Sequence, residues 1–396
     1  MADAQQPESL TPPAPEVPYW RLSGFYLFYF ASLGTLIPYW SLYLKQLDFS
    51  ARDIGSLMAL VMATKIISPN VWGWIADHTG QRMRIVRAGC LLATICFAGV
   101  FLDSRYGWLV VVMVAFSFFW NATLPQFEAT TFNYLGKHSH RYSGIRLWGS
   151  IGFIVAVAGL GPVLDAQGTT ILPLILLLLF AGIWVSSLLV PEQAAHHLPL
   201  AHVPLLKVLR RPEVLALLLV CFLMQASHGP YYTFYTLYME AHDYSRSVIG
   251  QLWALGVLAE VGVFLLMHRW VPRFGLRTLL LTSLGLTVLR WLLIGQFPEW
   301  MAVMIFAQLL HAASFGVYHA VAIQLIHRYF TGRNQGRGQA LYSSLSFGAG
   351  GAVGSFVSGL GWDTMGPANV YNLAALVALL ALGVAALWIR PAREQG

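Results

Sequence analysis

The stretch WNATLPQFEATTFNYLGKHSHRYSGIRLWGSIGFIVAVAGLGPVLD, residues 120–165, decides how this chain is organised. Two apolar segments flank the short basic loop GKHSHRYSG, and each carries one full charge, Glu128 before the loop and Arg146 after it. Both charges are nine residues from Lys137 in the loop, so an antiparallel helical hairpin would place them at the same depth. A charge inside a membrane costs roughly 2.5–3.5 kcal/mol and is kept only where a partner or a water-filled cavity receives it. We therefore expect Glu128 and Arg146 either to pair with each other or, as we favour, to bind something that comes and goes.

The composition of the chain places it in a membrane. Hydrophobic residues make up 57% of the sequence and charged residues 10%, whereas a soluble domain has about 25% charged residues. The cysteines Cys90, Cys96 and Cys221 lie in apolar segments without CxxC spacing. We interpret them as small hydrophobic residues rather than disulfide partners or metal ligands, and we expect no metal and no cofactor.

Twelve apolar stretches of about 20 residues predict twelve transmembrane helices. They are residues 20–44, 54–76, 83–102, 107–132, 144–163, 169–190, 213–238, 247–268, 277–296, 300–324, 339–361 and 369–389. The predicted fold is therefore an all-α membrane protein with two six-helix bundles, residues 20–190 and 213–390. A cytoplasmic linker, 191–212, joins them, and tails at 1–19 and 391–396 flank them. The N-terminal tail is polar and proline-rich and lacks the basic and apolar regions of a signal peptide, so we expect it to be disordered.

The placement of Lys and Arg predicts the orientation. If both termini are cytoplasmic, 17 of the 24 basic residues lie in cytoplasmic tails and loops and four in the opposite loops. The remaining three, Lys65, Arg146 and Arg290, lie within predicted spans. This asymmetry follows the positive-inside rule, so the net charge of +7 is a topology signal and needs no nucleic-acid partner.

The two halves of the chain repeat each other. The loops after the second and eighth predicted spans read GWIADHTGQRMR (73–84) and HRWVPRFGLRTL (268–279). Aligning Gly80 with Gly275 places Lys65 and Glu260 at the same internal position, with opposite charge. Parallel six-helix repeats around a site near the middle of the bilayer are typical of secondary transporters.

The loop at 73–84 resembles the loop motif of the major facilitator superfamily. The motif is glycine, three residues, aspartate, two residues, glycine and a basic pair; Gly73, Asp77, Gly80 and Arg82 match it, and Gln81 replaces the first basic residue. The resemblance implies that these four residues latch the cytoplasmic side and form a conformational gate. The alternative is a basic loop that only sets topology.

A closer resemblance covers nearly the whole chain. It is carried by YSGIRLWGS (142–150), MQASHGPYY (224–232), LWALGVLAEVGVF (252–264), LRWLLIG (289–295) and LLHAASFGVYH (309–319). These segments resemble the bacterial 3-phenylpropionic acid transporter family, which is similar to the lactose permeases. The resemblance implies a monomeric proton symporter in the bacterial inner membrane, with both termini cytoplasmic.

Charged positions match the lactose permeases residue by residue. The resemblance implies substrate-binding roles for Glu128, Arg146 and Glu260, and it places Phe153 where a sugar-stacking tryptophan lies. Two further positions, Arg290 and His311, match an arginine and a histidine of the proton-coupling network. The chain departs from the pattern at Ser314, which replaces the proton-carrying glutamate, and at Gln308, which replaces a lysine. A proton site must therefore lie elsewhere.

The residue types themselves are consistent with these roles. The guanidinium of Arg146 can hold a carboxylate or a diol through two parallel hydrogen bonds, which lysine cannot do. In this hypothesis Glu128 orients the substrate; the alternative is a static ion pair. Lys65 and Glu260 lie in apolar runs and are candidate proton carriers, a structural charge pair between the halves, or, for Lys65, an anchor for an anionic substrate.

Histidines supply the remaining candidates. His311 shares one helix face with Ser314, and histidine titrates near physiological pH, which suits proton coupling; the alternative is a histidine hydrogen-bonded within the bundle. His228 precedes Gly229–Pro230, where a broken helix would expose polar groups to a substrate. His319 and Glu240 carry no assignment.

The sequence therefore favours a proton-coupled symporter of a small organic solute, most consistent with an aromatic carboxylate such as 3-phenylpropionate. A sugar or nucleoside symporter and an efflux antiporter are alternatives on the same fold, and a non-transporting receptor is another. No HExxH, nucleophile elbow or GxxxxGK[ST] motif occurs, which argues against an enzyme or an ATP-driven pump.

Overall fold

The computed structural model describes residues 17–192, 205–332 and 334–390. Most of the predicted tail 1–19, the centre of the linker 191–212 and the tail 391–396 lie outside the described residues. The first six predicted spans form α1 (Tyr19–Gln46), α2 (Ala51–Thr79), α3 (Arg82–Ala98), η1 (Gly99–Phe101), α4 (Tyr106–Leu135), η2 (Gly136–Arg141), α5 (Tyr142–Gln167), η3 (Thr169–Ile171) and α6 (Leu172–Leu188).

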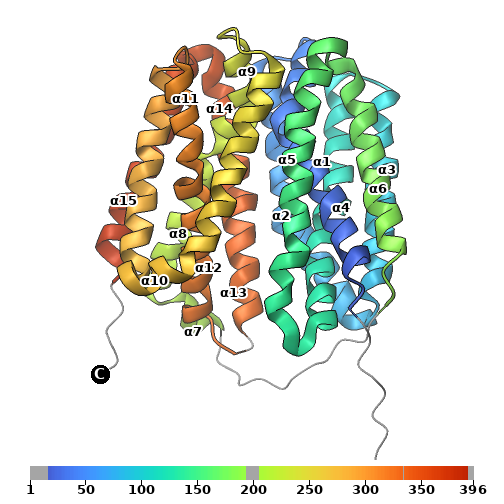
Figure 1. Cartoon of the computed structure of the whole chain (residues 1–396), viewed down its shortest axis with the longest axis vertical. Helices are drawn as coiled ribbons and strands as arrows, with labels where there is room; N and C mark the ends of the chain where they lie inside the picture. Colours follow the sequence, from blue (N-terminus) through green and yellow to red (C-terminus); the bar gives the residue numbers. More distant parts are fainter. Residues whose placement is uncertain (1–16, 193–204, 333, 391–396) are drawn as a thin grey trace, which may run out of the picture.

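The second six predicted spans are more often interrupted. They form α8 (Pro212–Ser227), α9 (Gly229–Glu240), α10 (Arg246–Gln296), α11 (Met301–Leu309), η4 (Ala312–Val317), α12 (Tyr318–Tyr329), α13 (Asn334–Ser343), η5 (Ser344–Gly350), α14 (Gly351–Met365) and α15 (Pro367–Trp388). The short helix α7 (Leu205–Leu209) lies in the predicted linker. Figure 1 shows the helices up to α6 grouped on one side and the helices from α8 onward on the other. The described chain contains helices and no strand, which confirms the all-α membrane fold.

Many of the helices are longer than the apolar stretches that predicted them. Within the described residues, eleven helical segments are long and apolar enough to cross a membrane. The eleventh predicted span, 339–361, is absent from these eleven segments and lies in the continuous helical run of α13, η5 and α14, which is rich in glycine and serine. The loop predicted at 268–279 is wrong in extent, because α10 is broken at Gly275 alone, with φ of 76°. Glycine adopts this left-handed conformation without the steric cost that a Cβ brings.

The two halves meet at the end of the molecule where α2 and α10 begin. We call this the capped end, and we call the opposite end, which carries the turns at Gly80 and Gly275, the loop end. At the capped end the Asp165 carboxylate of α5 accepts hydrogen bonds from the backbone N–H groups of Arg246 and Ser247, both at 2.9 Å. It thereby caps the first turn of α10 in the other half, where an anion also complements the helix dipole.

The same arrangement occurs with the halves exchanged. The Asp363 carboxylate of α14 accepts a hydrogen bond from the backbone N–H of Ala51, at 3.3 Å, at the start of α2. Each half therefore supplies one aspartate that caps a helix of the other half. The sequence carried a signal for this pair that the span analysis missed: GPVLD (161–165) and GLGWD (359–363) place a glycine four residues before each aspartate.

Glycines allow the helices to approach closely at the capped end. A Cβ on Gly161 would lie 2.5 Å from the carbonyl oxygen of Arg246, and one on Gly359 would lie 2.7 Å from that of Ala51. The helices that receive the caps begin with related segments, SARDIG (50–55) and SRSVIG (245–250), whose serines are both N-caps. These glycines therefore let α5 and α14 each approach the first turn of a helix in the other half.

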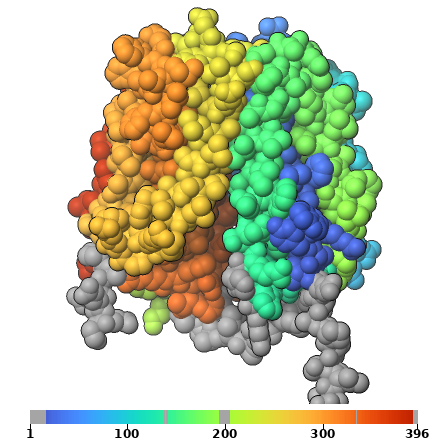
Figure 2. Space-filling model, viewed as in Figure 1, coloured from blue at the N-terminus to red at the C-terminus, as the bar shows by residue number. Residues whose placement is uncertain are grey.

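The loop end is less filled between the halves. In Figure 2 the surface is hollowed between the yellow helix of α10 and the green helix of α5, and orange atoms from later in the chain lie deeper in the hollow. The hollow lies in the lower part of this view (Figure 2), at the end where α5 begins (Figure 1). On this face the halves are therefore in contact at the capped end and apart toward the loop end, whereas α2 stays in contact with the other half, where the Asn70 amide donates to Ser344 Oγ at 3.4 Å.

Helix α5 packs against α1 so closely that substitution should be costly. A Cβ on Gly152 would lie 2.2 Å from the carbonyl oxygen of Leu27. Because that atom belongs to a helix backbone, we expect Gly152→Ala to force the helices apart and destabilise the protein by about 1–3 kcal/mol. The measurement is the apparent thermal midpoint in detergent. Gly159→Ala on the same helix meets no atom within 4 Å and should leave the midpoint unchanged or raised; equal midpoints for both variants would contradict the packing.

Candidate functional site

The two charges of the opening stretch do not form a closely packed hairpin. Side chains of α1 fill the space between α4 and α5: the rings of Phe25 and Phe127 stack with centroids 3.7 Å apart, and Tyr26 lies 6.3 Å from Tyr142. The Tyr26 hydroxyl also donates to Thr131 Oγ1, at 3.1 Å. The antiparallel pair predicted at 120–165 therefore touches near its connecting turn, where the rings of Phe132 and Tyr142 stack with centroids 4.5 Å apart, and aromatic side chains of α1 pack against both helices.

Glu128 and Arg146 make no ion pair in the described chain. Glu128 Oε1 accepts a hydrogen bond from the Tyr142 hydroxyl, at 3.0 Å. The Arg146 guanidinium lies over the ring of Phe30, 3.7 Å from its centroid, and makes no hydrogen bond among the described residues. Both charged side chains keep partial solvent access. The static ion pair is therefore absent from this conformation, and the donors of Arg146 are free.

Lys65 lies on the inner face of α2. The exposed apolar residues Ile67, Val71 and Trp74 mark the opposite face of the helix, which suits lipid. Thr64 and Ser68, next to Lys65, are bonded to α4. Lys65 itself makes no ion pair with Glu260 or with any other carboxylate of the described chain. The alternative of a structural charge pair between the halves is not present here.

Arg290 is buried at the centre of a neutral acceptor network. Its Nη1 donates to Ser314 Oγ at 2.9 Å and contacts His311 Nδ1 at 3.0 Å, and its Nη2 donates to Gln308 Oε1 at 3.3 Å. The Tyr231 hydroxyl also donates to Gln308 Oε1, at 2.9 Å. The residues that depart from the lactose permease pattern, Gln308 and Ser314, therefore act as neutral acceptors for the guanidinium.

The network sets the tautomer of His311. Arginine carries only donors, so His311 Nδ1 must accept from Arg290, which leaves the ring proton on Nε2. His311 Nε2 faces Glu260 Oε2 at 3.6 Å, and the Glu260 side chain is 16% exposed. Within the described chain, Glu260 is the carboxylate that contacts this pair, with one side toward His311 and one toward solvent.

Charges from the two halves act on one another across the interface. Arg146 on α5 interacts electrostatically with Glu128 in its own half and with Glu260 and His319 in the other half. Because these four side chains are all partly accessible, the charged positions converge on the space between the halves.

The sequence matches a known protein family over most of its length. The profile of the MFS_1 like family matches residues 19–373. The chain belongs to this family of the major facilitator superfamily. It is 29% identical over 375 residues to the probable 3-phenylpropionic acid transporter of Escherichia coli strain K12, covering 92% of this chain and 96% of that protein. It is 25% identical over 388 residues to the maltose permease of Geobacillus stearothermophilus, covering 94% and 95% respectively.

Solved structures show the same fold. A mutant form of the nucleoside transporter NupG superposes with a TM-score of 0.82 at 15% identity, covering 94% of this chain and all of that one. A POT family transporter, PepTSo, superposes with a TM-score of 0.73 at 12% identity, covering 94% and 97%. The family and its relatives identify the chain as a multi-pass membrane transporter of small molecules, and not an enzyme.

The loop motif of this MFS_1-like transporter is assembled as an ion-paired turn. Asp77 and Arg82 form an ion pair, and Arg82 Nη1 also donates to Gln126 Oε1 of α4 at 2.8 Å. Gly80 ends α2 with φ of 67°, and a Cβ on Gly73 would lie 3.3 Å from the Gln126 amide nitrogen. The four residues predicted to form a gate thus lie together at the loop end, next to α4.

His228 and Phe153 differ in their access to solvent. His228 separates α8 from α9, so the predicted helix break is confirmed. Its ring is 0% exposed and packs against Trp291, and its Nε2 has no partner among the described residues. Phe153 packs against α1, where a Cβ on Gly34 would lie 3.1 Å from its ring. In this conformation Phe153 keeps partial access, whereas His228 has none.

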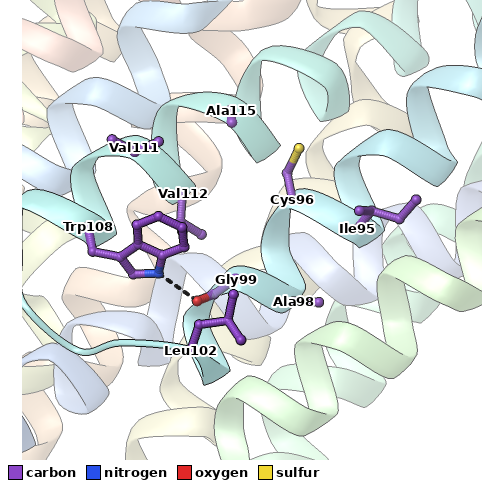
Figure 3. Close-up of a pocket in the computed structure, with 9 residues that line it drawn as sticks. All are labelled: Ile95, Cys96, Ala98, Gly99, Leu102, Trp108, Val111, Val112 and Ala115. Atoms are coloured by element: carbon purple, nitrogen blue, oxygen red, sulfur yellow. Dashed lines mark hydrogen bonds between the residues drawn. The ribbon is translucent and has the colours of Figure 1, made fainter.

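A separate pocket on the surface of the MFS_1-like transporter has a different character. Figure 3 shows it between the end of α3, η1 and the start of α4, where Trp108 Nε1 donates to the carbonyl oxygen of Gly99 at 2.7 Å. Its lining side chains are apolar or small. None of the charged residues above lines it, so we do not assign the substrate to it.

Proposed function

We propose that this transporter is a proton-coupled symporter of a small organic anion, with an aromatic carboxylate such as 3-phenylpropionate as the preferred class. The observation that carries the proposal is Arg146, an interior guanidinium with free donors that lies against an aromatic ring and faces the other half of the protein. A planar guanidinium beside an aromatic surface suits a carboxylate attached to a ring. The name of the Escherichia coli relative supports this choice.

Alternating access follows from the two ends of the molecule. Substrate would enter the space between the halves from one side, and the halves would then rock about it. The capped end holds the halves together through Asp165 and Asp363, and the loop end carries the Asp77–Arg82 turn. The excess of basic residues at the loop end supports a cytoplasmic position for it.

Uptake into proteoliposomes tests the proposal. Under an imposed inward proton gradient we expect 3-phenylpropionate to accumulate, and we expect excess maltose or uridine not to compete. Depletion of preloaded substrate would instead indicate antiport. Competition by maltose or uridine would favour the sugar or nucleoside alternative, which the names of other relatives support.

We further propose that Glu260 carries the proton through its contact with His311, because Ser314 cannot. Glu260→Gln should abolish uphill accumulation, since an amide neither binds nor releases a proton at neutral pH. It should retain exchange of 3-phenylpropionate in counterflow, because the amide keeps the shape of the site. Glu299→Gln, at an exposed position, is the control. Accumulation at the wild-type level in Glu260→Gln would contradict the assignment.

A further inference from the structure

A histidine that the sequence left unassigned, His319, lies in the second half of the protein with a partly accessible side chain. His319 is the second residue of α12, two residues after the π-helical segment η4 ends, and its Nδ1 contacts the hydroxyl of Tyr342, at 2.7 Å. Tyr342 lies two residues before the second π-helical segment, η5. Such single-turn π segments within α-helices occur frequently at functional sites. The contact therefore joins two distorted helices, α12 and α13, at the space between the halves.

Aromatic rings hold the imidazole in place. Phe315 stacks on His319 with centroids 5.7 Å apart and planes 10° apart, and Phe347 lies 5.9 Å away. Tyr342 is 1% exposed, so its hydroxyl is removed from water. A side chain packed on two rings and bonded to a third loses little conformational freedom when it binds a ligand.

The contact with Tyr342 leaves the other ring nitrogen as a donor. A phenol hydroxyl donates well to an imidazole nitrogen, so Tyr342 donates to Nδ1 and the ring proton resides on Nε2. Nε2 has no partner in the part of the chain that the structure describes, and unlike Nε2 of His228 it is not sealed from solvent. His319 therefore presents one N–H to the space between the halves.

Two free donors thus face this space, one from each half. Arg146 belongs to α5 and makes no hydrogen bond among the described residues; His319 belongs to α12, and the charge of Arg146 reaches it. We propose that the substrate carboxylate bridges Arg146 and His319 Nε2, so that each half of the transporter holds one side of the anion. This inference rests on the proposed function, since it requires an anionic substrate at Arg146.

A carboxylate bound to both Arg146 and His319 would change the contacts of both halves at once. Without substrate, Arg146 also interacts with Glu260, a carboxylate of the second half. A substrate carboxylate replaces that interaction, because both anions compete for one guanidinium. His319 therefore acts as a specificity residue that favours a carboxylate over an uncharged group of the same shape.

Two amide substitutions test the roles of the two ring nitrogens of His319 one at a time. His319→Asn places an amide near Nδ1, so it keeps the contact with Tyr342 and removes the distal donor. His319→Gln places its amide nitrogen near Nε2 and restores that donor. Affinities for 3-phenylpropionate and for the uncharged 3-phenylpropan-1-ol are measured by calorimetry on the full chain in detergent. A hydrogen bond to a charged group is among the stronger ones. We therefore expect His319→Asn to lower the affinity for 3-phenylpropionate roughly tenfold or more and to change the affinity for 3-phenylpropan-1-ol less than about twofold.

The controls distinguish the inference from the proposed function. His319→Gln should recover most of the affinity for the acid, and His327→Asn, an exposed position on the same helix, should change neither ligand. Unchanged acid affinity in His319→Asn, or equal losses for acid and alcohol, would overturn the bridge. If Arg146→Ala abolishes binding of 3-phenylpropionate while His319→Asn does not weaken it, the contact with His319 is contradicted and the proposed function is retained. Wild-type protein that binds no acid would overturn both.

Discussion

Replacing Arg146 with lysine should weaken binding of an anionic substrate about tenfold or more, and replacing it with alanine should abolish accumulation. Lysine keeps the charge but loses the planar fork that makes two parallel hydrogen bonds and the flat face that lies on Phe30. Hydrogen bonds to charged groups contribute about 1.5–3 kcal/mol each, and 1.4 kcal/mol corresponds to tenfold in affinity. The measurement is calorimetric affinity for 3-phenylpropionate alongside uptake in proteoliposomes.

The same substitution of arginine by lysine at another position is the control for Arg146→Lys. Arg141→Lys lies five residues earlier, is exposed and should change neither affinity nor uptake. Wild-type affinity in Arg146→Lys would count against recognition through two parallel hydrogen bonds and leave a simple charge attraction. A loss of thermal stability in Arg146→Lys that matches the loss of affinity would assign the residue a packing role.

Removing both aspartate caps should open the capped end. Replacing an N-cap residue with alanine costs about 0.5–2 kcal/mol, and Asp165 and Asp363 cap separate helices, so their effects should add. The combined cost, about 1–4 kcal/mol, shifts the equilibrium between conformations with the capped end closed and conformations with it open by fivefold or more. We therefore expect Asp165→Ala with Asp363→Ala to populate conformations in which the halves are apart at this end.

Distances between spin labels measure this opening. Exposed positions on the two halves at the capped end are Leu102 and Trp300, labelled after Cys90, Cys96 and Cys221 are replaced by serine. The double alanine variant should show a new, longer distance, and each single variant a smaller share of it. Asparagine also caps helices, so Asp165→Asn with Asp363→Asn should remain closer to wild type. An unchanged distance distribution in the double alanine variant would show that the glycine contacts alone hold this end.

Several features of the fold were determined by the sequence alone. The twelve apolar stretches and the lack of charge set the all-α membrane fold, because bilayer thickness dictates helix length. The repeated loops at 73–84 and 268–279 indicated two related halves. Glu260 and Arg146 were found because a charge inside an apolar run is costly and is kept for a reason.

Only the tertiary structure decided which of these charges meet. Helices α4 and α5 follow each other in the sequence, but aromatic side chains of α1 pack against both of them. Periodicity reports the face of a helix and not its neighbour, so Gln308 and Ser314 could not be recognised as acceptors for Arg290. His319 and the two aspartate caps depend on contacts between residues far apart in the chain. Such contacts are set by how the helices fill space together, so a local pattern such as GPVLD or GLGWD marks a repeat and does not identify its partner.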